Sequence, residues 1–153
     1  GALLADGEMD ALFFSRVPSS LEDGRARRLF PDPRAACAEF HGRNGFYPIM
    51  HVIAIKDEII AANPDVPAQL LDLYGQAKAL VSTYMDEPGW SQLPWARLAR
   101  EEQNALIQDD LWPVGFAANR ANIERFIGYS LAQDLIDREL APEALFDPSV
   151  IAS

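Results

Sequence analysis

The sequence predicts a helix-rich α/β fold, and three observations lead to this prediction. Two short apolar runs, at 10–15 and 49–56, have the length and composition of buried strands. The stretches that follow them carry apolar residues at helical spacing, interrupted by Pro and Gly. Because two strands alone cannot form a stable sheet, we expect the other strands to come from an absent N-terminal part or from a second copy of the chain.

The first residues read as the end of an element. Residues 2–7 have the pattern of a last helical turn closed by Gly7, and a strand is expected to follow over 10–15. A chain rarely starts inside a helix end, so we expect a fragment of a longer protein. The polar and basic stretch 19–28 is typical of a surface loop.

The next helix has a clear start signal. Pro33 suits a first helical position and Asp32 suits the N-cap before it. We expect this helix to end at about residue 40 or 41, because glycines stand at both ends of 42–45. The run 49–56 is apolar on both faces, which predicts a strand covered on both sides.

Helices dominate the remainder of the predicted structure. Asp57 suits an N-cap, Pro67 suits a first turn, and Pro142 suits the start of a short last helix. Loops are expected where Trp, Pro and Gly gather, at 87–94 and 111–116. The expected helices cover residues 58–62, 65–81 and beyond, 95–105, 121–139 and 142–146.

Composition narrows the function classes. The 153 residues suffice for one domain, and their net charge of −10 disfavours nucleic acid as a partner. No apolar run approaches the roughly 20 residues that cross a bilayer, so we expect no membrane span. Cys37 is the sole cysteine, so an internal disulfide is excluded. We expect a cytoplasmic protein, or a periplasmic one if it binds solutes for import.

Five sequence blocks carry a family resemblance. They are Asp-Ala-Leu-Phe-Phe-Ser-Arg-Val-Pro-Ser at 10–19, Arg-Leu-Phe-Pro-Asp at 28–32, Phe-Tyr-Pro-Ile-Met-His-Val at 46–52, Trp-Pro-Val-Gly at 112–115 followed by Asn119 and Arg120, and Tyr129, Gln133 and Leu135 followed by Leu-Phe-Asp-Pro at 145–148. In this order they resemble the blocks of the 4,5-dihydroxyphthalate decarboxylase-like family. Val114 stands where that family usually has Tyr, and Asp134 stands where Gly is usual. The second departure costs little if the helix continues through it.

The resemblance implies a fold and a place within it. The family has the type 2 periplasmic-binding-protein fold, with two α/β lobes, a hinge and a ligand cleft between the lobes. The chain is similar to the C-terminal half of such a protein, which makes residues 1–153 a single partial domain. Residues 1–20 would form the end of one lobe and a crossover, and residues 21–153 the C-terminal half of the other lobe.

The resemblance also implies an activity. We expect a decarboxylase, a carbon–carbon lyase, acting on a hydroxylated aromatic dicarboxylate such as 4,5-dihydroxyphthalate. The reaction needs cations for the carboxylates and an acid to protonate carbon, and it requires no metal or organic cofactor. The alternative is a non-catalytic solute-binding protein of an ABC importer for a small anionic or aromatic ligand. Exposed strand edges further predict a homodimer of the fragment.

Arg16 and His51 are the predicted catalytic residues. Arg16 follows a predicted strand, at the edge where ligands gather, and Arg can hold a carboxylate with two hydrogen bonds. Ser15 and Ser19 are candidate donors to the same carboxylate. His51 has a pKa suited to proton delivery. The alternatives are a surface ion pair for Arg16, loop or capping roles for both serines, and a core position for His51.

Trp112, Asn119 and Arg120 form the second predicted group. Trp112 can stack on an aromatic ligand, and Arg120 can reach a carboxylate. Asn119 is either a ligand contact or a plain N-cap of the helix expected from residue 121. For Arg120 the alternative is a solvent-facing side chain. His41 is assigned to a contact with the C-terminal dipole of its helix.

Overall fold

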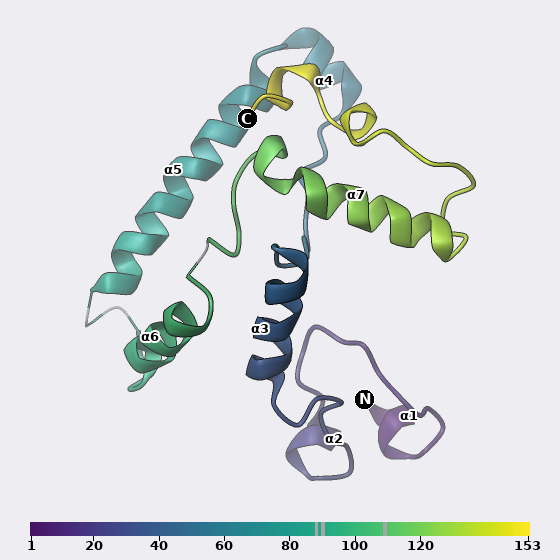
Figure 1. Cartoon of the computed structure of the whole chain (residues 1–153), viewed down its shortest axis with the longest axis vertical. Coiled ribbons are helices and arrows are strands. Elements are labelled where there is room, and N and C mark those ends of the chain that lie inside the picture. The colour runs from purple at the N-terminus through teal and green to yellow at the C-terminus, as the bar shows by residue number, and fades with distance from the viewer. Residues whose placement is uncertain (88, 90, 109) are drawn as a thin grey trace. The chain divides into compact units, whose positions relative to one another are not determined.

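The computed structural model describes residues 1–87, 89, 91–108 and 110–153, so Pro88 and Trp90 of the predicted loop, and Asp109, lie outside the described residues. Helices make up all its regular structure in these ranges, and no strand is present among them (Figure 1). The helices are α1 (Ala2–Ala5), α2 (Ser19–Glu22), α3 (Pro33–Asn44), α4 (Asp57–Ala62), α5 (Val66–Asp86), α6 (Ala96–Leu106), α7 (Phe116–Ala132), and the 3-10 turns η1 (Pro142–Leu145) and η2 (Pro148–Val150). The helix-rich part of the prediction is therefore confirmed.

The two predicted strands are wrong for this structure. Residues 10–15 and 49–56 run without regular structure, and the apolar side chains of Phe13 and Val52 are 94% and 68% exposed. A strand needs a neighbour for its backbone N–H and C=O groups. Neither segment has a strand beside it in the described chain, so the apolar composition alone does not produce one.

The chain divides into two compact units, Gly1–Cys37 and Ala38–Ser153, and each is described by itself. In the first unit Gly7 adopts φ +74°, and the N–H of Glu8 donates to the carbonyl of Leu3 at 2.9 Å. This confirms that Gly7 closes a helix. The single turn α2 lies inside the stretch predicted as loop, and its Ser20 is fully buried.

The start of α3 is confirmed, and its predicted end is wrong. The backbone N–H of Ala35 donates to Asp32 Oδ1 at 3.0 Å, as an N-cap requires. The helix continues through Gly42 and stops before Gly45, which has φ +73°. One glycine inside a helix costs only about 1 kcal/mol, whereas a left-handed residue ends the helix.

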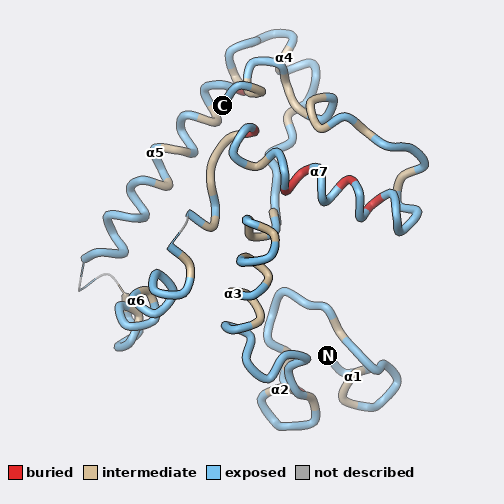
Figure 2. The backbone as a smooth tube through the Cα atoms, in the orientation of Figure 1, coloured by how far each residue is buried: buried red, intermediate tan, exposed pale blue. Residues whose placement is uncertain are grey.

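The core of the second unit lies along α7. Figure 2 shows the buried positions concentrated on this helix, where Phe116, Ile123 and Ile127 are 4–5% exposed. The rings of Phe116 and Phe146 meet edge to face with centroids 5.2 Å apart. Partly buried apolar residues pack against this core: Ile49, Ile136, Leu140, Phe146 and Ile151. The core therefore joins the segment after α3 to the C-terminal turns.

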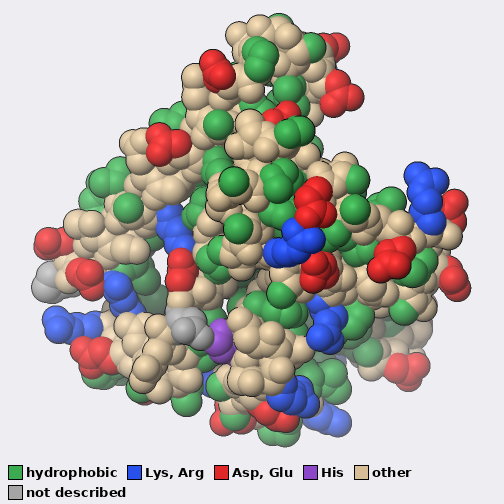
Figure 3. Space-filling model, turned by 45° about the horizontal axis from the view of Figure 1, so that its top comes forward, with side chains coloured by type: hydrophobic (Ala, Val, Ile, Leu, Met, Phe, Trp, Pro, Cys, Tyr) green, Lys and Arg blue, Asp and Glu red, His purple; other side chains and the backbone are tan. Residues whose placement is uncertain are grey.

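Much apolar surface elsewhere stays exposed. On α5, whose predicted position is confirmed, Leu73, Leu80 and Tyr84 are each at least half exposed. Figure 3 shows hydrophobic side chains spread among charged ones over the visible face. The homodimer remains a prediction that these exposed side chains favour. Among the described helices, none combines the length and apolar character that crossing a membrane requires.

The predicted extension of α7 to residue 139 is wrong. The helix begins at Phe116 and ends at Ala132, and Asp134 adopts a left-handed φ of +56°. The N–H of Asp134 donates to Leu131 O at 3.1 Å, and that of Leu135 donates to Ser130 O at 2.9 Å. These two bonds form a Schellman motif. The expectation that Asp134 costs little was conditional on the helix continuing, and this condition is not met, because the position that is usually Gly in the family is a left-handed cap here.

Asp134→Gly is expected to stabilise the fold by about 0.5–1 kcal/mol, since Gly adopts left-handed backbone without the steric cost of a Cβ. The matched reverse change is Gly7→Asp, at the equivalent position after α1, which should destabilise by a similar amount. Urea unfolding followed by circular dichroism measures both. A loss of stability in Asp134→Gly would contradict the strain assigned to this cap.

Candidate functional site

A small, partly open cavity lies in the second unit, between the end of α3 and the start of α7. We call it the Tyr47 cavity. Its volume is about 80 Å³, and its polar lining comes from His41 on α3, Tyr47, Asp110, and Asn119 and Asn122 on α7. The ring of Tyr47 meets that of Trp112 edge to face at a centroid distance of 4.9 Å. The lining residues thus carry a phenol, a carboxylate, two amides and an imidazole.

Asn122 holds one wall of the cavity in place. It is 6% exposed, its Nδ2 donates to the carbonyl of Tyr47 at 2.6 Å, and its Oδ1 accepts the N–H of Ile49 at 3.3 Å. The side-chain amide of Asn122 therefore makes the two backbone hydrogen bonds that a neighbouring strand would otherwise make. Asn122 fixes the backbone just before the extended run 49–56, and with it the position of the Tyr47 ring.

Asn119 closes the turn that follows Trp112. Its Nδ2 donates to the carbonyls of Pro113 and Gly115, at 2.7 and 2.8 Å. The N-cap interpretation of Asn119 is wrong, because α7 begins at Phe116 and Asn119 already lies within its first turns. The amide reaches backward and keeps the turn against the helix. Asn119 also lines the Tyr47 cavity, so this anchoring and a ligand contact are compatible.

Ser153 caps the first turn of α7. Its Oγ accepts the N–H of Phe116 at 3.0 Å, and its backbone oxygen accepts the N–H of Ala117 at 2.7 Å. These bonds satisfy two of the N–H groups that the start of a helix leaves without intrahelical partners. Gly115 permits this approach, since it has φ +103° and a Cβ there would stand 2.8 Å from the backbone carbon of Ser153.

Asp110 connects α5 to the turn. Its Oδ1 accepts the N–H of Trp112 at 3.0 Å, and its Oδ2 accepts Lys78 Nζ, which also donates to the carbonyl of Trp112. Partial burial favours the neutral acid, but Lys78 and the Trp112 N–H outweigh it and hold the pKa of Asp110 below its usual value. The carboxylate is therefore ionised at neutral pH.

Arg120 is engaged by acidic neighbours. Its Nε donates to Glu124 Oε1 at 2.9 Å, Nη1 donates to Glu143, and its guanidinium carbon lies 5.8 Å from the centroid of the Phe116 ring. Hydrogen bonding to Glu143 raises the pKa of Arg120. A ligand carboxylate at Arg120 would have to replace one of these glutamates.

The other predicted site residues are exposed. Ser15, Arg16 and Ser19 lie in the first unit, at the bend before α2 and at its first residue. His51 lies in the second unit, in the extended run, and is not part of the described lining of the Tyr47 cavity. The core interpretation of His51 is wrong, because no sheet forms around it. His41 lies in the last turn of α3, where the predicted dipole contact requires it, and it also lines the cavity.

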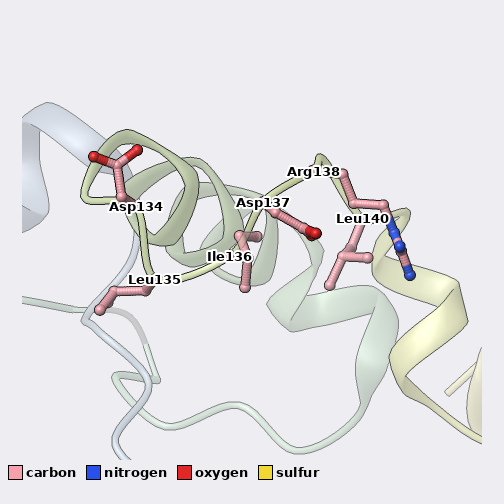
Figure 4. Close-up of a pocket in the computed structure, with 6 residues that line it drawn as sticks. All are labelled: Asp134, Leu135, Ile136, Asp137, Arg138 and Leu140. Atoms are coloured by element: carbon pink, nitrogen blue, oxygen red, sulfur yellow. The ribbon is translucent and has the colours of Figure 1, made fainter.

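A second hollow, of about 630 Å³, lies beside the segment after α7. Figure 4 shows its six lining side chains strung along this one segment, from Asp134 to Leu140, without a common centre. None of the predicted site residues lines it. A ligand site encloses most of its ligand, which a single segment does not achieve. Within the described residues, no three His, Cys, Asp or Glu side chains cluster as metal ligands would.

The chain is 32% identical over 155 residues to a protein of Comamonas testosteroni named 4,5-dihydroxyphthalate decarboxylase, and the alignment covers 99% of this chain. The chain is a relative of 4,5-dihydroxyphthalate decarboxylase. This match confirms the resemblance that the sequence blocks predict. No family model matches the chain.

The chain spans 47% of the length of this decarboxylase. An alignment over nearly the whole chain includes the cavity residues and all seven predicted site residues. Because the chain covers less than half of that protein, its activity and substrate are proposals for this chain. The two-lobed fold stays a prediction, since the match concerns sequence alone.

Sequence reasoning missed three residues that build the site: Lys78, Asn122 and Ser153. Their partners lie 32–75 residues away along the chain, beyond the reach of local patterns. Asn122 carried a usable signal, because it is a polar residue directly before the apolar Ile123 on a helix. A polar residue on the buried side of a helix usually has a hydrogen-bond partner.

Proposed function

We propose that the chain is part of a carboxy-lyase that acts on a hydroxylated aromatic dicarboxylate, with 4,5-dihydroxyphthalate as the first candidate. The observation that carries this proposal is the 32% identity, across 99% of the chain, to a protein named for that activity. We further propose that the intact protein has the two α/β lobes of the type 2 periplasmic-binding-protein fold and encloses its substrate between them.

The chemistry sets what the site must supply. Loss of CO2 breaks the bond between a ring carbon and the carboxyl carbon, and the electron pair stays with the ring. If that ring carbon first takes a proton while the para hydroxyl becomes a ketone, the pair restores the aromatic ring as CO2 leaves. A proton replaces the carboxyl group, so 4,5-dihydroxyphthalate gives 3,4-dihydroxybenzoate and CO2 without an oxidant.

The predicted residues have defined roles in this proposal. Arg16 and Arg120 hold the two carboxylates, and His51 moves the proton. The remaining predicted residues contact the bound substrate: Ser15, Ser19, Trp112 and Asn119. Trp112 suits this role, since it is 47% exposed and its ring is already oriented by Tyr47.

Activity is tested by incubating the intact gene product with 4,5-dihydroxyphthalate and measuring CO2 and 3,4-dihydroxybenzoate by chromatography. We expect equal amounts of both, and a rate lowered by about 10²–10⁴ in His51→Ala because a general acid is lost. Lys56→Ala, at an exposed position of the same run 49–56 with no assigned role, is the control. If the substrate binds but is recovered unchanged, the enzyme proposal is contradicted and a solute-binding protein is favoured.

A further inference from the structure

We propose that the Tyr47 cavity receives the hydroxyl-bearing edge of an aromatic ring and excludes its carboxylates. This inference deepens the proposed function and rests on it for the identity of the ring. It assigns a ligand class, adjacent phenolic hydroxyls, to a cavity that the predicted arginines do not line.

Both lining amides donate hydrogen bonds to the protein backbone. Both N–H bonds of Asn119 point to backbone carbonyls, those of Pro113 and Gly115. The amide of Asn122 donates to Tyr47 and accepts from Ile49. Asn119 can therefore offer a ligand only its oxygen, which is an acceptor.

Asp110 adds a charged acceptor to the same lining. An ionised carboxylate accepts hydrogen bonds and donates none, and each Asp110 oxygen has lone pairs beyond those used by Lys78 and Trp112. A second carboxylate placed beside it would meet repulsion, whereas a hydroxyl would donate to it. The Asn119 oxygen and the Asp110 carboxylate can therefore both accept from adjacent hydroxyls of a ligand, beside His41 and Tyr47, whose side chains can donate as well as accept.

The size of the cavity fits an edge of a ring better than a whole substrate. Its volume of about 80 Å³ is well below the roughly 300 Å³ at which sites for whole small molecules begin. The ring of Tyr47 lines the cavity and provides an apolar surface for the ring carbons. The hydroxyls would enter, and the carboxylates would stay outside, where cations can reach them.

The test separates the two halves of the substrate. Catechol carries the hydroxyls without carboxylates, and phthalate carries the carboxylates without hydroxyls. Isothermal titration of the protein with each probe gives two dissociation constants. We expect catechol to bind and Asp110→Asn to weaken it by about tenfold, the loss typical of a hydrogen bond to a charged group. Phthalate affinity should not weaken in this variant.

Controls keep the outcome clear. Asp110→Asn keeps the shape of the side chain, and circular dichroism checks its fold. Asp72→Asn, an exposed position on α5, is the matched charge change and should leave both constants unchanged. Catechol binding that is absent up to its solubility limit, or that is equal in wild type and Asp110→Asn, overturns the inference. An equal weakening of phthalate binding in Asp110→Asn also overturns the inference.

The two proposals fail separately. Catechol binding that depends on Asp110, in a protein that releases no CO2 from 4,5-dihydroxyphthalate, removes the decarboxylase proposal and leaves the cavity assignment. CO2 release with catechol affinity insensitive to Asp110 removes the cavity assignment and leaves the enzyme.

Discussion

Gly115→Ala is expected to lower the free energy of unfolding by about 2–4 kcal/mol. Gly115 has φ +103° and ψ 161°, a region that is essentially limited to glycine and costs other residues about 1–3 kcal/mol. The added Cβ would also stand 2.8 Å from the backbone carbon of Ser153. Relief of this overlap must move Ser153 away from α7 and break the two hydrogen bonds at its start. Urea unfolding monitored by circular dichroism measures the loss.

The matched control for this change is Gly128→Ala, on the same helix. Nothing lies within 4 Å of a Cβ built there, and the position is exposed. Replacing glycine by alanine inside a helix should stabilise it by about 0.5–1 kcal/mol. If both variants shift stability in the same direction, the packing of Gly115 against Ser153 does not have the role described.

Asn122→Ala is expected to cost about 2–3 kcal/mol. It leaves the carbonyl of Tyr47 and the N–H of Ile49 without their side-chain partner, in partly buried surroundings. Asn122→Asp should recover little, because a carboxylate can accept from Ile49 but cannot donate to Tyr47. Thermal unfolding of both variants measures the effect.

The control for Asn122 is Asn104→Ala on the exposed face of α6, which should change stability by less than about 0.5 kcal/mol. A second measurement follows the site itself. Since Asn122 positions Tyr47, and Tyr47 packs on Trp112, Asn122→Ala should alter the tryptophan fluorescence of the folded protein. Equal losses of stability in Asn122→Ala and Asn104→Ala would show that the bridge to Tyr47 and Ile49 is unimportant.

Local signals in the sequence predicted the helices well. The helix signals at Asp32, Pro33 and Gly7 act through neighbours within four residues. Such short-range interactions can be recognised from the sequence alone. The strands failed for the opposite reason. The run 49–56 has strand composition, but a strand forms only with a partner, and apolar residues do not reveal whether that partner is present.

The candidate site was predicted in part for the same physical reason. Trp112 and Asn119 belong to a recognisable sequence block, and both border or line the Tyr47 cavity. Asp110 lies two residues before this block, and its importance depends on Lys78, 32 residues earlier. The choice of His51 rests on its place in a family-like sequence block and stays a prediction. Only its core alternative, which depended on the predicted strand, is wrong.

The cap on α7 also has a consequence for the order of events during synthesis. Ser153 leaves the ribosome 37 residues after Phe116, whose N–H it accepts. At translation rates of about 5–20 residues per second, this delay is about 2 to 7 s. During that time the nascent α7 lacks its capping partner, so the helix that carries Asn119 and Asn122 is completed only near the end of this stretch of chain.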